Sequence, residues 1–169
     1  MKNCAQFWIF RMAGTPGASL MALGELLMPL VASKLHHLWT NRRVQISAEK
    51  MRVLVVDDNH NAAEALAAYL SFENMLCRMA FGGAEAIAVG IAWIPHAIIM
   101  DISMPGCSGF EAALTLRKDE RACGIAIIAF TALDEAEVCR HIVDSEFDGY
   151  CQKGQKPSEL VALVTSMAY

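Results

Sequence analysis

The chain has 169 residues, a length that suits one domain plus an appendage. Residues 1–50 hold six Lys/Arg against two acids, whereas residues 51–169 hold eight against sixteen, which gives net charges of +4 and −8. The acidic main body would repel phosphates and therefore argues against direct binding to nucleic acid.

Residues 1–50 show no strand-like alternation, and Gly and Pro interrupt their apolar background. The most apolar stretch, residues 18–35, contains Glu25, Pro29 and Lys34, so it is marginal for a membrane-spanning helix. Three interpretations of this extension stay open: disorder, a true start of translation at Met51, and an amphipathic helix that binds a membrane or a partner. Residues 40–50 are polar and are predicted to be a linker.

From Met51 onward, strand-like and helix-like segments alternate, which marks residues 51–169 as a separate domain. Short apolar runs predict strands over residues 52–56, 75–80, 96–100, 124–130 and 149–152. Apolar residues at helical spacing predict helices over residues 59–72, 83–91, 109–118 and 134–145, with a last helix that begins at Pro157. Five strand–helix units in this order predict an α/β fold with a doubly wound, five-stranded parallel sheet.

Reactive side chains stand directly after four of the five predicted strands. They are the carboxylates of Asp57 and Asp58, the carboxylate of Asp101, the hydroxyl of Thr131 and the ammonium of Lys153. The carboxyl ends of parallel strands share one edge of the sheet, where ligands bind. Three carboxylates so close together would repel, and Mg²⁺ with its oxygen ligands is the usual remedy. Nucleophile, metal, hydroxyl and ammonium together are the parts needed for phosphoryl transfer.

These motifs resemble the receiver domain of response regulators in two-component signalling. The matching segments are residues 55–59 (VVDDN), 100–106 (MDISMPG), 129–132 (AFTA) and 149–153 (GYCQK). Asp101 lies 43 residues after Asp58, Thr131 follows 30 residues later, and Lys153 follows after a further 22, as in the family. The resemblance covers residues 51–169 and implies a flavodoxin-like (βα)5 fold with strand order 2-1-3-4-5.

The resemblance also implies roles for single residues. Asp101 would accept a phosphoryl group from a sensor histidine kinase or a histidine phosphotransfer protein. Mg²⁺ would be the cofactor, and its ligands would be the side chains of Asp57, Asp58 and Asp101 and the backbone carbonyl of Ser103.

Three further residues would act at or near the phosphoryl group. Thr131 would bind a phosphoryl oxygen, Lys153 would pair with the group, and Tyr150 would change position together with Thr131 on activation. The chain departs from the family at Gly154, where the family usually has a proline reached through a cis bond. Without this proline the loop after Lys153 is expected to be looser.

The leading hypothesis is a bacterial single-domain response regulator, because the chain stops at Tyr169 shortly after the last predicted helix. Its output would pass through a downstream protein target, and its only chemistry would be its own phosphorylation and dephosphorylation. The six cysteines, which contain no C-x-x-C pair, favour reduced thiols and hence the cytoplasm. Membrane association through residues 18–35 stays open as an alternative.

Two other functions fit part of the pattern. A receiver-fold adaptor would bind partners without being phosphorylated, and the missing proline and the extension are consistent with it. An aspartate-nucleophile phosphohydrolase of the haloacid dehalogenase kind would use the same types of side chain. That class, however, has Asp-x-Asp after its first strand, whereas Asp57 and Asp58 are adjacent here.

Overall fold

The computed structural model describes residues 36–46, 50–144 and 146–169. The chain divides into two compact units, and the described residues all belong to the second, Leu35–Tyr169. The compact unit therefore begins well before Met51. Within the described ranges no helix is both long and apolar enough to cross a membrane, and the stretch 18–35 lies outside them.

The described part of the chain forms a six-stranded sheet in the order β1-β6-β5-β4-β2-β3. Five strands are parallel, namely β2 (Arg52–Val56), β3 (Leu76–Ala80), β4 (Ala97–Met100), β5 (Ala126–Thr131) and β6 (Gly149–Gln152). When these five strands are numbered 1 to 5 along the chain, they lie in the predicted order 2-1-3-4-5. The flavodoxin-like α/β fold is therefore confirmed. The sixth strand, β1 (His36–Leu38), was not predicted and pairs antiparallel with β6.

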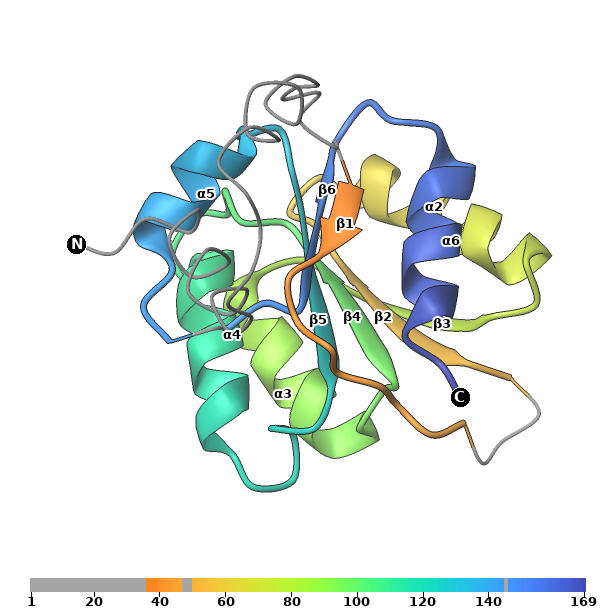
Figure 1. Ribbon diagram of the computed structural model, residues 1–169, viewed down its shortest axis with the longest axis horizontal. Helices are drawn as coiled ribbons and strands as arrows, with labels where there is room; N and C mark the ends of the chain where they lie inside the picture. Colours follow the sequence, from red (N-terminus) through yellow and green to blue (C-terminus); the bar gives the residue numbers. More distant parts are fainter. Residues whose placement is uncertain (1–35, 47–49, 145) are drawn as a thin grey trace, which may run out of the picture. The chain divides into compact units, whose positions relative to one another are not determined.

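Helices cover both faces of the sheet (Figure 1). On one face lie α2 (His60–Phe72) and α6 (Pro157–Ser166), and on the other lie α3 (Gly83–Trp93), α4 (Gly109–Lys118) and α5 (Glu135–His141). The central strands are buried on both sides, which explains their continuous apolar sequences. Side chains alternate between two cores, so that Leu54 and Val56 pack toward α3 and α4 while Val53 and Val55 pack toward α2 and α6.

Side-chain caps set where the helices begin. The Asn59 carboxamide oxygen accepts a hydrogen bond from the Ala62 amide at the start of α2, and Ser108 and Glu111 form a reciprocal capping box at the start of α4. Asp134 caps α5 as predicted, but α5 ends at His141 rather than at residue 145. The backbone becomes extended at Ile142, where the helix ends.

Residues 36–46, called the strap below, are part of the folded unit. The fully buried Asp148 accepts hydrogen bonds from Thr40 Oγ1 and Arg42 Nε at 2.8 Å each and from Arg117 Nη2 at 2.6 Å. Val44 is buried and its amide donates to the Met167 carbonyl at 2.8 Å. The prediction of a linker is therefore wrong for residues 40–46, because their polar side chains satisfy a buried acid instead of water.

The Asp148 cluster should contribute strongly to stability. Replacing Asp148 with Ala would leave Arg117 buried without its counter-charge, and burial already lowers the pKa of that guanidinium. We expect the free energy of unfolding to fall by about 3–5 kcal/mol, measured by urea denaturation followed by circular dichroism.

Asp119→Ala is the matched control, because Asp119 forms an ion pair with Arg121 at 2.7 Å near the surface. Solvent screens such pairs, so this variant should unfold close to the wild-type midpoint. Equal midpoints for the two variants would contradict the importance of the Asp148 cluster.

Candidate functional site

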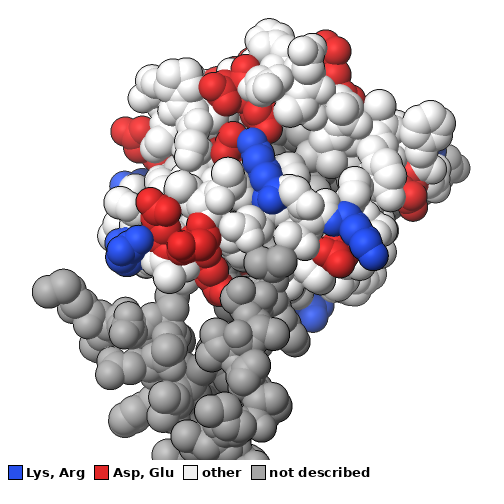
Figure 2. Space-filling model, turned by 90° about the horizontal axis from the view of Figure 1, so that it is seen from above, with Lys and Arg blue, Asp and Glu red and all other residues white. Residues whose placement is uncertain are grey.

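The carboxyl ends of the parallel strands face upward in Figure 1, and the predicted site residues gather there. Asp57 directly follows β2, Asp101 directly follows β4, Thr131 is the last residue of β5, and Lys153 directly follows β6. Figure 2 looks down on this edge and shows Asp and Glu side chains beside a few Lys and Arg side chains. The sheet topology therefore brings together groups that are far apart in the sequence.

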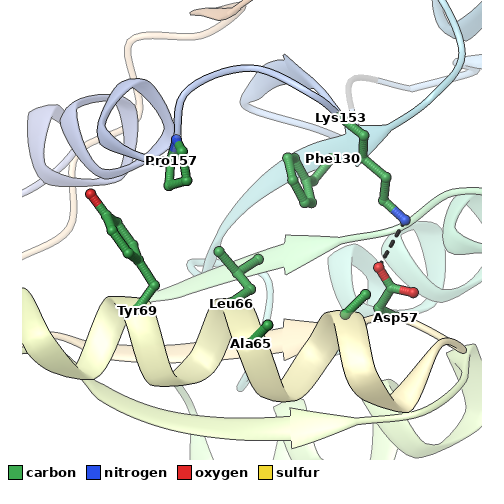
Figure 3. A pocket seen from close by; sticks show the side chains of 8 residues that line it. Asp57, Ala65, Leu66, Tyr69, Phe130, Lys153 and Pro157 are labelled. Carbon is green, nitrogen blue, oxygen red and sulfur yellow. Dashed lines mark hydrogen bonds and ion pairs between the residues drawn. The ribbon is translucent and has the colours of Figure 1, made fainter.

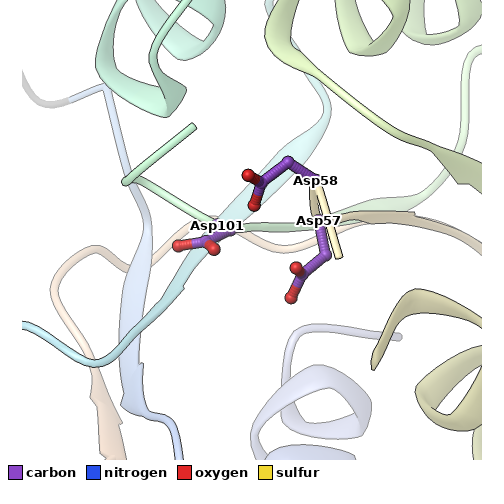
Figure 4. A group of neighbouring side chains, drawn as sticks. All are labelled: Asp57, Asp58 and Asp101. Atoms are coloured by element: carbon purple, nitrogen blue, oxygen red, sulfur yellow. The ribbon is translucent and has the colours of Figure 1, made fainter. Parts of the chain in front are cut away.

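Three carboxylates converge at this edge (Figure 4). Asp57, Asp58 and Asp101 each place an oxygen within 4.8 Å of the others. Asp57 and Asp101 are only 4% and 5% exposed, whereas Asp58 is exposed. Like charges at this spacing repel, so the cluster requires a cation.

The Lys153 ammonium supplies positive charge to the cluster. Its Nζ donates to Asp57 Oδ2 at 2.8 Å and to Asp101 Oδ2 at 2.6 Å. Burial by itself would lower the pKa of Lys153, but the hydrogen bonds and charges of Asp101 and Asp57 outweigh burial and raise it. The charged Lys153 therefore stabilises the folded state in full below pH 10.5, the ordinary pKa of lysine. This contribution is lost only as the pH rises through the higher pKa that Lys153 has in the folded state.

Backbone groups fix the direction of the two buried carboxylates. The Asn59 amide donates to Asp57 Oδ1 at 3.0 Å, and the Ser103 amide donates to Asp101 Oδ1 at 3.2 Å. Gly109 approaches the Asp101 carbonyl so closely that a Cβ would collide with it. The carbonyl of Ser103 as a metal ligand stays a prediction.

The acid cluster fits a hard divalent cation. Carboxylate oxygens are the ligands that Mg²⁺ prefers, and the exposure of Asp58 leaves room for the waters that Mg²⁺ usually keeps. The residues that could hold the ion are the three predicted aspartates. Their three negative charges outnumber the one positive charge of Lys153 that bridges two of them.

Thr131 and Tyr150 are linked through one residue, Leu133. The fully buried Thr131 accepts a hydrogen bond at Oγ1 from the Leu133 amide at 3.3 Å. The Tyr150 hydroxyl donates to the Leu133 carbonyl at 2.8 Å. Burial, followed by the charges of Glu135 and Asp134, raises the pKa of Tyr150 to about 12, so this hydroxyl remains a donor at neutral pH.

The loop after Lys153 turns without a proline. Gly154 has a φ of 92°, which glycine adopts without strain, and the described residues contain no cis peptide bond. The Lys153 amide donates to the Thr131 carbonyl at 2.8 Å and so holds the base of the lysine. The positive φ of Gly154 thus makes the turn directly after Lys153, and a looser loop in the absence of the proline stays a prediction.

An apolar cavity of about 420 Å³ adjoins the site between α2 and the β6–α6 loop (Figure 3). Leu66 and Tyr69 of α2 line it together with Phe130, and Asp57 and Lys153 stand at its end. The Lys153 ammonium lies 5.8 Å from the centre of the Phe130 ring. This cavity has no signature in the sequence, because its lining consists mostly of ordinary apolar residues from distant segments.

Trp39 is a second residue near the site that local sequence did not predict. Its ring stacks on Tyr150 with a centroid distance of 5.7 Å and an interplanar angle of 15°. Its position in an apparently irregular extension carried no periodic signal.

Comparisons with known proteins agree with this geometry. The family model described as the response regulator receiver domain matches residues 53–165. The DNA-binding response regulator MtrA of Mycobacterium tuberculosis is 31% identical over 115 residues, which cover 68% of this chain and 49% of that protein. The phosphate regulon transcriptional regulatory protein PhoB of Pseudomonas aeruginosa is 34% identical over 110 residues, 65% of this chain and 48% of that protein. The match thus spans about half the length of these regulators.

Solved structures show the same fold. A putative response regulator from Chloroflexus aurantiacus has a TM-score of 0.65 and 26% identity over 70% of this chain and 98% of its own. The chemotaxis protein CheY4 of Vibrio cholerae has a TM-score of 0.64 and 22% identity, with the same coverage of 70% and 98%. At this identity the second comparison supports the fold alone.

Lys153 and a bound cation should compete for the same carboxylates. Lys153→Met removes one positive charge from the cluster, so we expect affinity for Mg²⁺ to rise by at least about tenfold, measured by isothermal titration calorimetry. Lys118→Met, which removes an exposed cation at the end of α4, is the control and should bind Mg²⁺ as the wild type does. Unchanged affinity in Lys153→Met would show that the lysine does not oppose the metal.

Proposed function

The chain belongs to the response-regulator receiver family, and on that premise we propose that it is a signalling switch phosphorylated on Asp101. The observation that carries this proposal is the bridge from Lys153 to Asp57 and Asp101 within a cluster of three carboxylates. Response regulators interact with histidine kinases and with downstream targets. The phosphoryl donor is accordingly a sensor histidine kinase or a histidine phosphotransfer protein.

The Asp101 carboxylate is placed to act as the nucleophile. One of its oxygens forms a bond to phosphorus while the bond between phosphorus and the donor's imidazole nitrogen breaks, which leaves an acyl phosphate on Asp101. Lys153 already contacts Asp101 and would pair with the transferred group, and the Thr131 hydroxyl would donate to one of its oxygens. Mg²⁺ held by the aspartates would supply positive charge against the phosphoryl oxygens.

The apolar cavity beside the site suits the approach of a protein donor. Leu66, Tyr69 and Phe130 form a surface directly next to Asp57 and Lys153. Apolar contacts there would position a donor and exclude water from the acyl phosphate. This supports a protein donor over a free small molecule as the physiological source.

The chain's own chemistry is confined to its phosphorylation and dephosphorylation, in the cytoplasm. Phosphorylation adds charge beside Thr131 and so biases the surrounding turn, which a downstream protein target would sense. MtrA is named as a DNA-binding response regulator, and it is about twice as long as the segment that matches this chain. In this chain the acidic body around the site disfavours contact with nucleic acid, so the proposed output is a protein contact.

Incubation with Mg²⁺ and the small phosphodonor phosphoramidate, followed by intact mass spectrometry, tests the proposal. The wild type should gain the mass of one phosphoryl group, whereas Asp101→Asn should gain none because it lacks the nucleophile. Asp119→Asn, which alters an aspartate near the surface on another part of the fold, should behave as the wild type. Absence of any gain in the wild type would reject the switch and favour the adaptor.

The hydroxyl of Thr131 should be needed for stable phosphorylation. Thr131→Ala should lower the rate of phosphoryl gain by at least about tenfold, because one donor to the transferred group is lost. Thr131→Ser keeps the hydroxyl and should restore most of the rate, which time-resolved intact mass spectrometry measures. Equal rates in the two variants would remove Thr131 from the proposed mechanism.

A further inference from the structure

The strap covers one edge and one face of the domain next to Tyr150. His36, His37 and Leu38 pair with Cys151, Tyr150 and Gly149, so β1 occupies the edge of β6 that the five-stranded sheet would leave open. The next residues continue this contact, since the amides of Trp39 and Thr40 both donate to the Asp148 carbonyl, at 2.8 and 3.2 Å. An occupied edge cannot pair with another strand.

The strap is anchored at two further places beyond β1. The side chains of Thr40 and Arg42 bind the buried carboxylate of Asp148. Further along, Val44 forms a bridge with Ala168 beside the last helix. These polar and backbone contacts show that the strap is an integral part of the fold.

Trp39 makes two contacts that depend on the loop from β5 to α5 and on the first residue of α5. Its ring stacks on Tyr150, whose hydroxyl is held by the Leu133 carbonyl, and its Nε1 donates to Glu135 Oε1 at 2.9 Å. Leu133 and Glu135 lie two and four residues after Thr131. The strap therefore rests on the same short turn that the hydroxyl of Thr131 holds through the Leu133 amide.

We propose that the strap covers the surface formed by α5 and β6, called the α5–β6 face, in the unphosphorylated protein. Phosphorylation of Asp101 loosens the strap and exposes this face. The inference rests on the proposed function, because the signal enters through Thr131. When the Thr131 hydroxyl turns to a phosphoryl oxygen, the Leu133 amide loses its acceptor. The turn that carries Leu133 and Glu135 then shifts, and Trp39 loses the support of both Tyr150 and Glu135.

The coupling is reciprocal by thermodynamic necessity. If the phosphorylated state weakens docking of the strap, the docked strap weakens the phosphorylated state by the same factor. The occupant of the α5–β6 face is thus the chain's own residues 36–40 in the unphosphorylated state, and a protein target gains access to the face after the strap loosens.

Hydrogen exchange on the full chain, with intact mass recorded on the same samples, tests this inference. With Mg²⁺ and phosphoramidate, the amides of Trp39 and Thr40 should exchange about fivefold faster or more, while those of the central strand β4 stay protected. A gain of mass without faster exchange would overturn the inference and leave the proposed function intact. No gain of mass would reject both.

Single variants of the full chain give a second, independent readout. In Trp39→Ala, the Thr40 amide should exchange about fivefold faster than in the wild type even without the phosphodonor. The affinity of this variant for beryllofluoride with Mg²⁺ should rise by the same factor of about five. Trp93→Ala is the matched control. Trp93 is the last residue of α3, and its ring packs against Arg78, away from the strap. Faster exchange in Trp39→Ala with unchanged beryllofluoride affinity would show that the strap is structural and not coupled to the site.

Discussion

The attraction between one ammonium and two buried carboxylates organises this molecule. Lys153 holds Asp57 and Asp101 at 2.8 and 2.6 Å, where the two acids would otherwise repel each other. The arrangement is stable because each carboxylate also receives a hydrogen bond from a backbone amide, and because the two acids raise the pKa of Lys153 above its ordinary value. The cluster still carries excess negative charge, which favours the binding of a further cation.

The strand β6 connects this site to the rest of the fold through residues at its two ends and its middle. Lys153 follows its carboxyl end and bridges the acids, and Asp148 precedes its amino end and holds Thr40 and Arg42 of the strap. Between them, Tyr150 touches both the turn after Thr131 and the ring of Trp39. This short strand and its two flanking residues thus provide the lysine that bridges the acids, the anchor of the strap and the aromatic ring that lies between them.

The loop geometry around Asp101 and Lys153 shows two different uses of glycine. Gly109 permits a close backbone approach to the Asp101 carbonyl that a side chain would block. Gly154 takes a positive φ of 92° and redirects the chain directly after Lys153. Lys153 is thus held at its amide by the Thr131 carbonyl and is followed directly by the turn at Gly154.

Local sequence was sufficient to predict the parallel sheet and the gathering of Asp57, Asp101, Thr131 and Lys153 at one edge, whereas the strand order followed from the family resemblance. Apolar strands and polar strand ends are local patterns, and the parallel topology turns them into a shared location. The strap, the Asp148 cluster and the stacking of Trp39 on Tyr150 required the tertiary structure. A three-residue strand has too few positions to show a period, and the partners of a buried acid lie more than a hundred residues away from it in the sequence.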